Sequence, residues 1–74
     1  MDDAANYTFV ELIGHAAGRV WHKLHEEGPT SITKLSKAFD DIPRDTVMQA
    51  IGWLAREDKV QIEELKRGRI ISLR

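Results

Sequence analysis

The spacing of apolar residues predicts a long amphipathic helix over residues 9–27. Apolar side chains recur there every three or four positions and form one face, made of Phe9, Val10, Ile13, Ala16, Ala17, Val20 and Leu24. Gly28 and Pro29 end this helix, because glycine suits the left-handed position after a helix and proline cannot continue one. Residues 30–32 are β-prone and predict a minimal strand, and residues 1–7 are expected to form a flexible tail.

Two shorter helices are predicted in the middle of the chain, at residues 33–39 and 44–57. Thr33 is a favourable N-cap for the first of them. Its buried side would be made of Leu35, Ala38 and Phe39. Residues 40–43 form a turn, since the residue before a proline avoids helical backbone angles. The second helix would bury residues at helical spacing, namely Val47, Ala50, Ile51 and Leu54.

The C-terminal residues alternate between apolar and polar side chains and predict two strands, 59–65 and 69–73. A basic turn, Lys66-Arg67-Gly68, separates them, and Gly68 supplies the positive φ that a tight hairpin needs. The short strand at 30–32 would pair with this hairpin. The order helix, strand, helix, helix, strand, strand is that of a winged helix-turn-helix, an α+β fold. Such a fold can place its last helix in a DNA major groove with the hairpin, or wing, beside it.

Length and composition limit what else the chain can be. Its 74 residues make at most one domain, spanning residues 1–74, and a core this small requires good packing or self-association. There is no cysteine, which excludes a disulfide and a thiolate metal site. The apolar runs are too short to span a bilayer, and Asp2 and Asp3 stand where a signal peptide would be basic. We therefore expect a cytoplasmic protein with no membrane association.

Positive charge is concentrated at the C-terminal end of a chain whose net charge is −1. Residues 59–74 contain five bases and two acids, whereas residues 1–30 contain five acids and two bases. A basic excess is typical of proteins that bind DNA, and here it is confined to the predicted wing. The charge distribution therefore favours a phosphate contact by the wing.

Three segments resemble a known family of small winged-helix proteins. They are Ala17-Gly18-Arg19-Val20-Trp21, Ile32-Thr33-Lys34-Leu35-Ser36-Lys37-Ala38 and Gly52-Trp53-Leu54-Ala55-Arg56-Glu57-Asp58-Lys59. The resemblance extends from Phe9 to Leu73 and is to stand-alone prokaryotic winged helix-turn-helix proteins of uncharacterised function. It implies the fold and brings no activity with it. Because some members are thought to be homodimers, it also implies a homodimer.

The outward face of the predicted 44–57 helix is the candidate for reading double-stranded DNA. With the apolar residues turned inward, the opposite side carries Asp45, Gln49, Gly52 and Arg56. Gln49 can pair with adenine through two hydrogen bonds, and Arg56 can reach guanine or a phosphate. Arg44 lies nearer the edge of this face. Asp45 opposes the interpretation, because phosphates repel a carboxylate, and an ordinary solvated helix face is the alternative.

Lys66, Arg67 and Arg69, near the tip of the predicted wing, are candidates for phosphate contacts. The alternative is that charges at a hairpin tip keep the chain soluble and block edge-to-edge pairing. Together with the helix candidates, they suggest a DNA-binding protein, for example a small transcriptional regulator.

Trp21 and Trp53 lie at the edges of the predicted apolar faces and suggest an interface. A half-buried tryptophan either completes a core or forms a binding hot spot. Gly14 and Gly18 flank Trp21 on the first helix and would let a partner helix approach closely. The second hypothesis is therefore a protein-interaction module, a homodimer or an adaptor without DNA binding. The alternative is that both tryptophans pack within the chain against the wing.

No combination of residues predicts catalysis, a metal or a cofactor. His15, His22 and His25 share the first helix, but without characteristic carboxylate spacing or cysteine they are more typical of solvated side chains than of zinc ligands. The sequence has no Gly-rich phosphate loop, nucleophile elbow or catalytic triad. A chain this short also leaves little room for an enclosed pocket. We expect neither an enzyme nor a protein with a small-molecule ligand.

Overall fold

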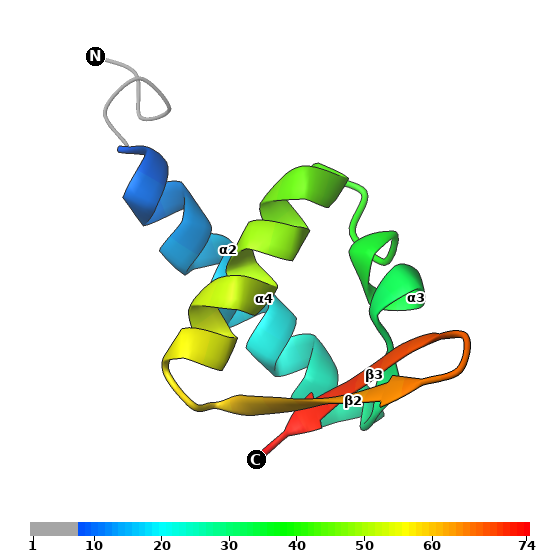
Figure 1. Ribbon diagram of the computed structural model, residues 1–74. Helices are drawn as coiled ribbons and strands as arrows, with labels where there is room; N and C mark the ends of the chain where they lie inside the picture. The colour runs from blue at the N-terminus through cyan, green and yellow to red at the C-terminus, as the bar shows by residue number, and fades with distance from the viewer. Residues whose placement is uncertain (1–7) are drawn as a thin grey trace.

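The computed structural model describes residues 8–74 and has the predicted winged helix-turn-helix architecture (Figure 1). Its elements are, in chain order, α2 (Phe9–Glu27), β1 (Thr30–Ser31), α3 (Ile32–Ser36), α4 (Arg44–Arg56), β2 (Val60–Leu65) and β3 (Gly68–Leu73). The strands form one antiparallel sheet in the order β1-β3-β2, so the α+β class and the pairing of the short strand with the wing are confirmed. The predicted tail at residues 1–7 lies outside the described residues.

Local hydrogen bonds fix both ends of α2. At its start, the Thr8 hydroxyl accepts a hydrogen bond from the Glu11 backbone at 3.0 Å, and the Glu11 carboxylate accepts one from the Thr8 backbone at 2.9 Å. This reciprocal pair is a capping box, which satisfies two backbone donors. At the other end, Gly28 terminates the helix as the sequence predicted, but with φ 79° and ψ −166° in place of the left-handed helical conformation, and its N–H donates to the Leu24 carbonyl.

The buried face of α2 is shorter than its apolar pattern indicated. Its buried residues are Ala16, Ala17, Val20 and Leu24. Phe9 and Val10 were expected in this face but are 62% and 58% exposed. The reason is visible in Figure 1, where the first turns of α2 extend beyond the body formed by α3, α4 and the sheet. Apolar periodicity thus identified correctly which side of α2 is buried, but it overestimated how far along the helix the buried face extends.

The helix predicted at residues 33–39 is displaced and shortened. The α3 helix begins at Ile32 and is capped by Ser31, whose hydroxyl accepts from the Lys34 backbone at 3.0 Å, so the assignment of Thr33 as the cap is wrong. Ile32 is buried in the core, and this favours its inclusion in the helix. After Ser36 the chain leaves the helix, which exposes Ala38 and leaves Phe39 only half-buried, contrary to their predicted burial.

An exposed ion pair ties the loop between α3 and α4 to α2. The Arg19 guanidinium donates two hydrogen bonds to the Asp41 carboxylate, at 2.8 and 3.2 Å. The guanidinium carbon also lies 5.5 Å from the centre of the Phe39 ring, a cation–π arrangement. These hydrogen bonds from Arg19 hold the pKa of Asp41 below its ordinary value of 3.8. The pair therefore restrains the loop that leads into α4.

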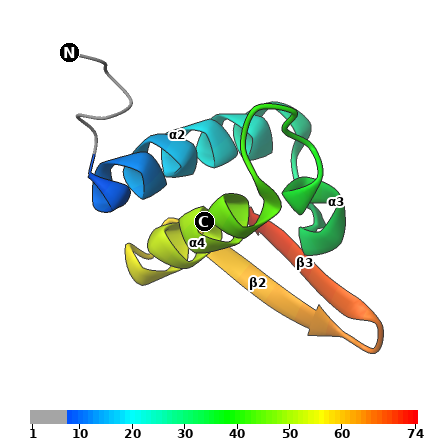
Figure 2. The ribbon, with the colours of Figure 1, turned by 90° about the horizontal axis from the view of Figure 1, so that it is seen from above.

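The helix α4 packs against α2 and contributes the predicted buried residues to the core (Figure 2). The core consists of Ala16, Ala17, Val20, Leu24, Ile32, Leu35, Val47, Ala50, Ile51, Leu54, Val60 and Ile71. The helix ends at Arg56, one residue before the predicted boundary. Asp58 then adopts φ 62°, and the Lys59 N–H donates to the Leu54 carbonyl at 3.0 Å. This turn directs the chain from α4 into the wing.

The wing is a regular antiparallel hairpin that projects away from the helices (Figures 1 and 2). Val60 pairs with Leu73 at its base and Leu65 pairs with Gly68 at its tip, where Gly68 has the predicted positive φ, 100°. In β2 the predicted half-buried pattern holds only at the base: Val60 is 4% exposed, whereas Ile62 is 38% exposed. The reason is that β2 is the edge strand, whereas Ile71, which pairs with Ile62 from the central strand β3, is fully buried.

We expect the Arg19–Asp41 pair to stabilise the fold at neutral pH and to stop doing so in acid. A carboxyl whose folded pKa is lowered contributes stability above its unfolded pKa, about 4, and loses that contribution as pH falls through the lower folded value. Asp41→Asn should therefore lower the melting temperature at pH 7, and the loss should become smaller as the pH falls below about 4, measured by circular dichroism. Asp40→Asn is the matched control, since no ion pair among residues 8–74 includes Asp40. An equal loss from both substitutions at pH 7 would contradict the role of the pair.

Candidate nucleic-acid interface

The outward face of α4 carries the side chains predicted to read DNA. Because Val47, Ile51 and Leu54 are buried, the helix turns Gln49 and Arg56 to solvent, and both are exposed. The other members of this face, Asp45 and Gly52, and the edge residue Arg44 are exposed as well. Arg44 and Arg56 stand at the two ends of the helix, about 18 Å apart along its axis at ~1.5 Å per residue. The face therefore carries the Asp45 carboxylate, the Gln49 amide and the Arg56 cation, with Arg44 at its edge.

The wing tip presents two further cations. Lys66 and Arg67 form the two-residue turn between β2 and β3, and both are exposed. Arg69, the third predicted wing contact, is compensated: its Nε lies 3.2 Å from a carboxylate oxygen of Glu64, its cross-strand neighbour. The tip is therefore less positive than the sequence suggested.

Other ion pairs reduce the positive charge of the C-terminal region further. Lys59 lies 3.5 Å from Glu57, and Arg74 lies 3.0 Å from Asp58. Within residues 8–74, the predicted DNA contacts that have no acidic partner are Arg44, Arg56, Lys66 and Arg67. These four cations, with Gln49, are the groups available for phosphates and base edges.

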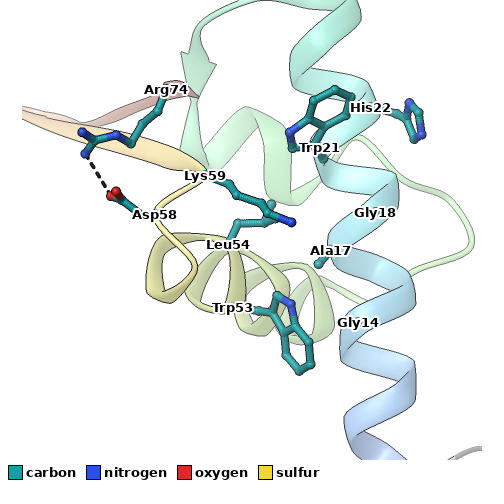
Figure 3. A pocket seen from close by; sticks show the side chains of 10 residues that line it. All are labelled: Gly14, Ala17, Gly18, Trp21, His22, Trp53, Leu54, Asp58, Lys59 and Arg74. Atoms are coloured by element: carbon teal, nitrogen blue, oxygen red, sulfur yellow. Dashed lines mark ion pairs between the residues drawn. The ribbon is translucent and has the colours of Figure 1, made fainter.

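A second surface lies between α2 and the C-terminal half of α4 (Figure 3). It is an open hollow of about 590 Å³ whose lining includes Gly14, Gly18, Trp21, Trp53, Lys59 and Arg74. We refer to it as the tryptophan hollow. All four residues predicted at a partner interface, Gly14, Gly18, Trp21 and Trp53, are thus brought together by the fold.

Each tryptophan is half-buried and contributes one wall of the tryptophan hollow. The Trp53 ring lies over Gly14, where an added Cβ would be 3.6 Å from it, whereas an added Cβ on Gly18 would meet nothing within 4 Å. Trp21 stacks on His25 with ring centres 5.2 Å apart. Both rings are partly buried against the hydrophobic core, which includes Val60 and Ile71 of the wing, and each leaves part of its surface facing the hollow.

The sequence did not indicate that Lys59 and Arg74 border the tryptophan hollow. Lys59 arrives there because the turn at Asp58 reverses the chain, which brings its side chain beside Leu54 (Figure 3). Arg74 arrives because its backbone N–H donates to the Lys59 carbonyl at 3.1 Å. Helical periodicity has no signal for either contact. The positive φ of a non-glycine residue after a helix is a feature that only the structure reveals.

No group of three His, Asp or Glu side chains within residues 8–74 is placed to hold a metal ion. No helix in the same part of the chain is both long and apolar enough to cross a membrane.

The fold and the exposed α4 face define a protein of the winged helix-turn-helix class, and the sequence places it in a particular family. Residues 1–73 match the family described as winged helix-turn-helix domain (DUF2582), and the chain belongs to that family. It is 36% identical over 64 residues to the uncharacterized protein MJ1608 of Methanocaldococcus jannaschii, covering 84% of this chain and 90% of that protein. It is also similar to the solution NMR structure of protein BT2368 from Bacteroides thetaiotaomicron. That match has a TM-score of 0.77 and 35% identity, covering 89% of this chain and 79% of the other.

Proposed function

We propose that this protein binds double-stranded DNA through α4 and the wing, in the manner of a small transcriptional regulator. The observation that supports the proposal is that four of the five cations predicted to contact DNA are exposed and have no acidic partner within residues 8–74, namely Arg44, Arg56, Lys66 and Arg67. In winged helix-turn-helix proteins these elements are suited to a major groove and the flanking backbone. The proposal therefore rests on two observations: the fold is often used for DNA binding, and these four cations are available to contact phosphate.

In this mechanism, any discrimination between DNA sequences would come from side chains of α4. Gln49 would pair with adenine through its amide, and a good bidentate contact of this kind is worth about 1–3 kcal/mol against the wrong base. Arg44 and Arg56 would contact phosphate or guanine at the two ends of the helix. Gly52 presents no side chain on this face, so the backbone can approach the groove closely. The Asp45 carboxylate would be repelled by phosphate and could accept a hydrogen bond only from a cytosine amino group.

The wing would contribute contacts that position the protein without reading sequence. Lys66 and Arg67 are placed for phosphates, while Arg69 is held by Glu64. Four phosphate contacts correspond to a slope of about −3.6 for the logarithm of affinity against the logarithm of salt concentration, at ~0.9 per contact. Binding should consequently be weak at physiological salt and clear at low salt.

The first test is a salt-dependent titration of a fluorescent DNA duplex, followed by anisotropy. We expect Arg67→Ala to weaken binding and to reduce the slope by about 1, because one phosphate contact is lost. Lys23→Ala is the control, since Lys23 lies on α2 and pairs with Glu27. If wild-type protein does not bind duplex DNA at low salt, the proposed function is wrong.

The second test uses the compensated arginine of the wing. Glu64→Gln removes the partner of Arg69, which frees a fifth cation, and should tighten DNA binding and increase the salt slope by about 1. Glu63→Gln is the matched control, because it removes an equal charge from the adjacent residue, whose cross-strand neighbour is Ile70. Equal gains from the two substitutions would show that only net charge matters and that the pair has no specific effect.

A second candidate function, a protein-interaction module, is favoured by the tryptophan hollow. Its walls are aromatic and its floor is made of small residues, a combination found at binding hot spots. If this surface binds a partner chain, Trp53→Ala should abolish the association while Arg67→Ala leaves it unchanged, as measured by analytical ultracentrifugation. The opposite pattern would exclude the tryptophan hollow as the contact.

A further inference from the structure

The tryptophan hollow is lined by hydrogen-bond donors that have no acceptor in the described part of the chain. No hydrogen bond within residues 8–74 includes the indole N–H of Trp21 or Trp53. In Figure 3 the Lys59 side chain extends from the base of the wing toward α2 and ends between the two indole rings. Indole and ammonium groups donate hydrogen bonds and do not accept them, so they cannot satisfy one another. The hollow therefore favours an occupant that brings acceptors.

The charges on the lining of the hollow add to one positive charge. Lys59 and Arg74 are cations and Asp58 is an anion, with the lining histidine counted as neutral. Asp58 is compensated by Arg74, whose guanidinium nitrogen lies 3.0 Å from the carboxylate. The Lys59 ammonium lies 3.5 Å from Glu57, which is outside the lining, and its three N–H groups leave donors free for the hollow. The lining therefore suits a ligand that carries a single negative charge.

The apolar part of the lining suits a flat ligand. His25 covers one face of the Trp21 ring, with ring centres 5.2 Å apart, and the rest of that ring is left for the hollow. The Trp53 ring lies over Gly14, and Gly18 adds no side chain to the floor. Aromatic rings attract one another in stacked or edge-to-face geometry beyond the area that they bury. The volume of about 590 Å³ is within the range of ~300–1,000 Å³ that is typical of small-molecule sites.

We propose that the tryptophan hollow binds a small aromatic carboxylate. The aromatic ring of the ligand lies against Trp21 and Trp53, and its carboxylate lies beside Lys59. Each carboxylate oxygen accepts more than one hydrogen bond, so the ammonium and an indole N–H can share the same group. A purely apolar ligand would cover the rings and leave these donors without acceptors, which weakens binding. The inference assigns the hollow to a small molecule in place of a partner chain, and it does not depend on DNA binding.

The first test is an NMR titration of the ¹⁵N-labelled chain with phenylacetate. The chain has two tryptophans and both border the hollow, so the two indole N–H signals report on this site. We expect both signals to shift to saturation, with a Kd of about 1 mM or tighter for a ligand of about ten non-hydrogen atoms. Phenylacetamide is the matched ligand, because it has the same shape without the charge, and it should bind about three- to tenfold more weakly. Equal affinity for the two ligands, or no saturable shift of either indole signal, would overturn the proposal.

The contribution of the cation is tested by Lys59→Gln. This variant should bind phenylacetate about three- to tenfold more weakly and bind phenylacetamide as the wild type does, because only the charged ligand loses a partner. Lys37→Gln is the matched control, since Lys37 is exposed, borders no part of the hollow and has no ion pair within residues 8–74. An equal loss from the two variants would mean that only net charge matters, contrary to the proposal.

The position of the ligand is tested by filling the hollow. Gly18→Leu adds a side chain where an ideal Cβ meets nothing within 4 Å, so circular dichroism should show an intact fold while phenylacetate binding is lost. Ala55→Leu is the control, because Ala55 is an exposed residue of α4 outside the lining, and this variant should bind as the wild type does. Binding that survives Gly18→Leu would place the ligand elsewhere and contradict the assignment. Indole signals that move with protein concentration in the absence of ligand would show that a second copy fills the hollow, which would also contradict it.

Discussion

The packing of α4 against α2 determines which surfaces this protein can offer. The facing sides of the two helices are rich in alanine, with Ala16, Ala17 and Ala50 all buried, and small side chains let helices approach closely. This contact also fixes the rotation of α4 about its own axis. One side of the helix is committed to the core, Gln49 and its neighbours face solvent, and Trp53 lies against α2. The wing follows from the same contact, because the turn after α4 starts from a helix end that α2 holds in place.

Two candidate binding surfaces result, and they differ in chemistry. The outward side of α4 and the wing tip offer separated cations and one amide, which suits a polyanion with a regular backbone. The side of α4 that carries Trp53 borders a hollow lined by two tryptophans, two glycines and several charged side chains. Both surfaces involve α4 but use different sides of it. The proposed DNA contacts and a protein contact at the hollow can therefore be tested separately by substitution.

Much of the fold could be predicted from sequence, because helical periodicity and turn residues are local signals. These local signals predicted the order of elements, the hairpin turn at Gly68 and the buried residues of α4. The errors arose where tertiary context decides: Ser31 replaced Thr33 as a cap because Ile32 is buried in the core, and Val10 is exposed because the first turns of α2 lie beyond α3, α4 and the sheet. Helix geometry correctly predicted which side of α4 is buried and which is exposed. Which of the cations have an acidic partner could not be predicted, since the ion pair of Arg69 with Glu64 depends on the register of the two strands.

The central claim, that α4 and the wing contact DNA, is tested most directly by NMR on ¹⁵N-labelled protein titrated with a short duplex at low salt. The account predicts that signals of Gln49, Arg56 and Arg67 shift with increasing DNA, while the indole N–H signals of Trp21 and Trp53 stay in place. Shifts restricted to the two indole signals, or no shift at any position, would contradict it.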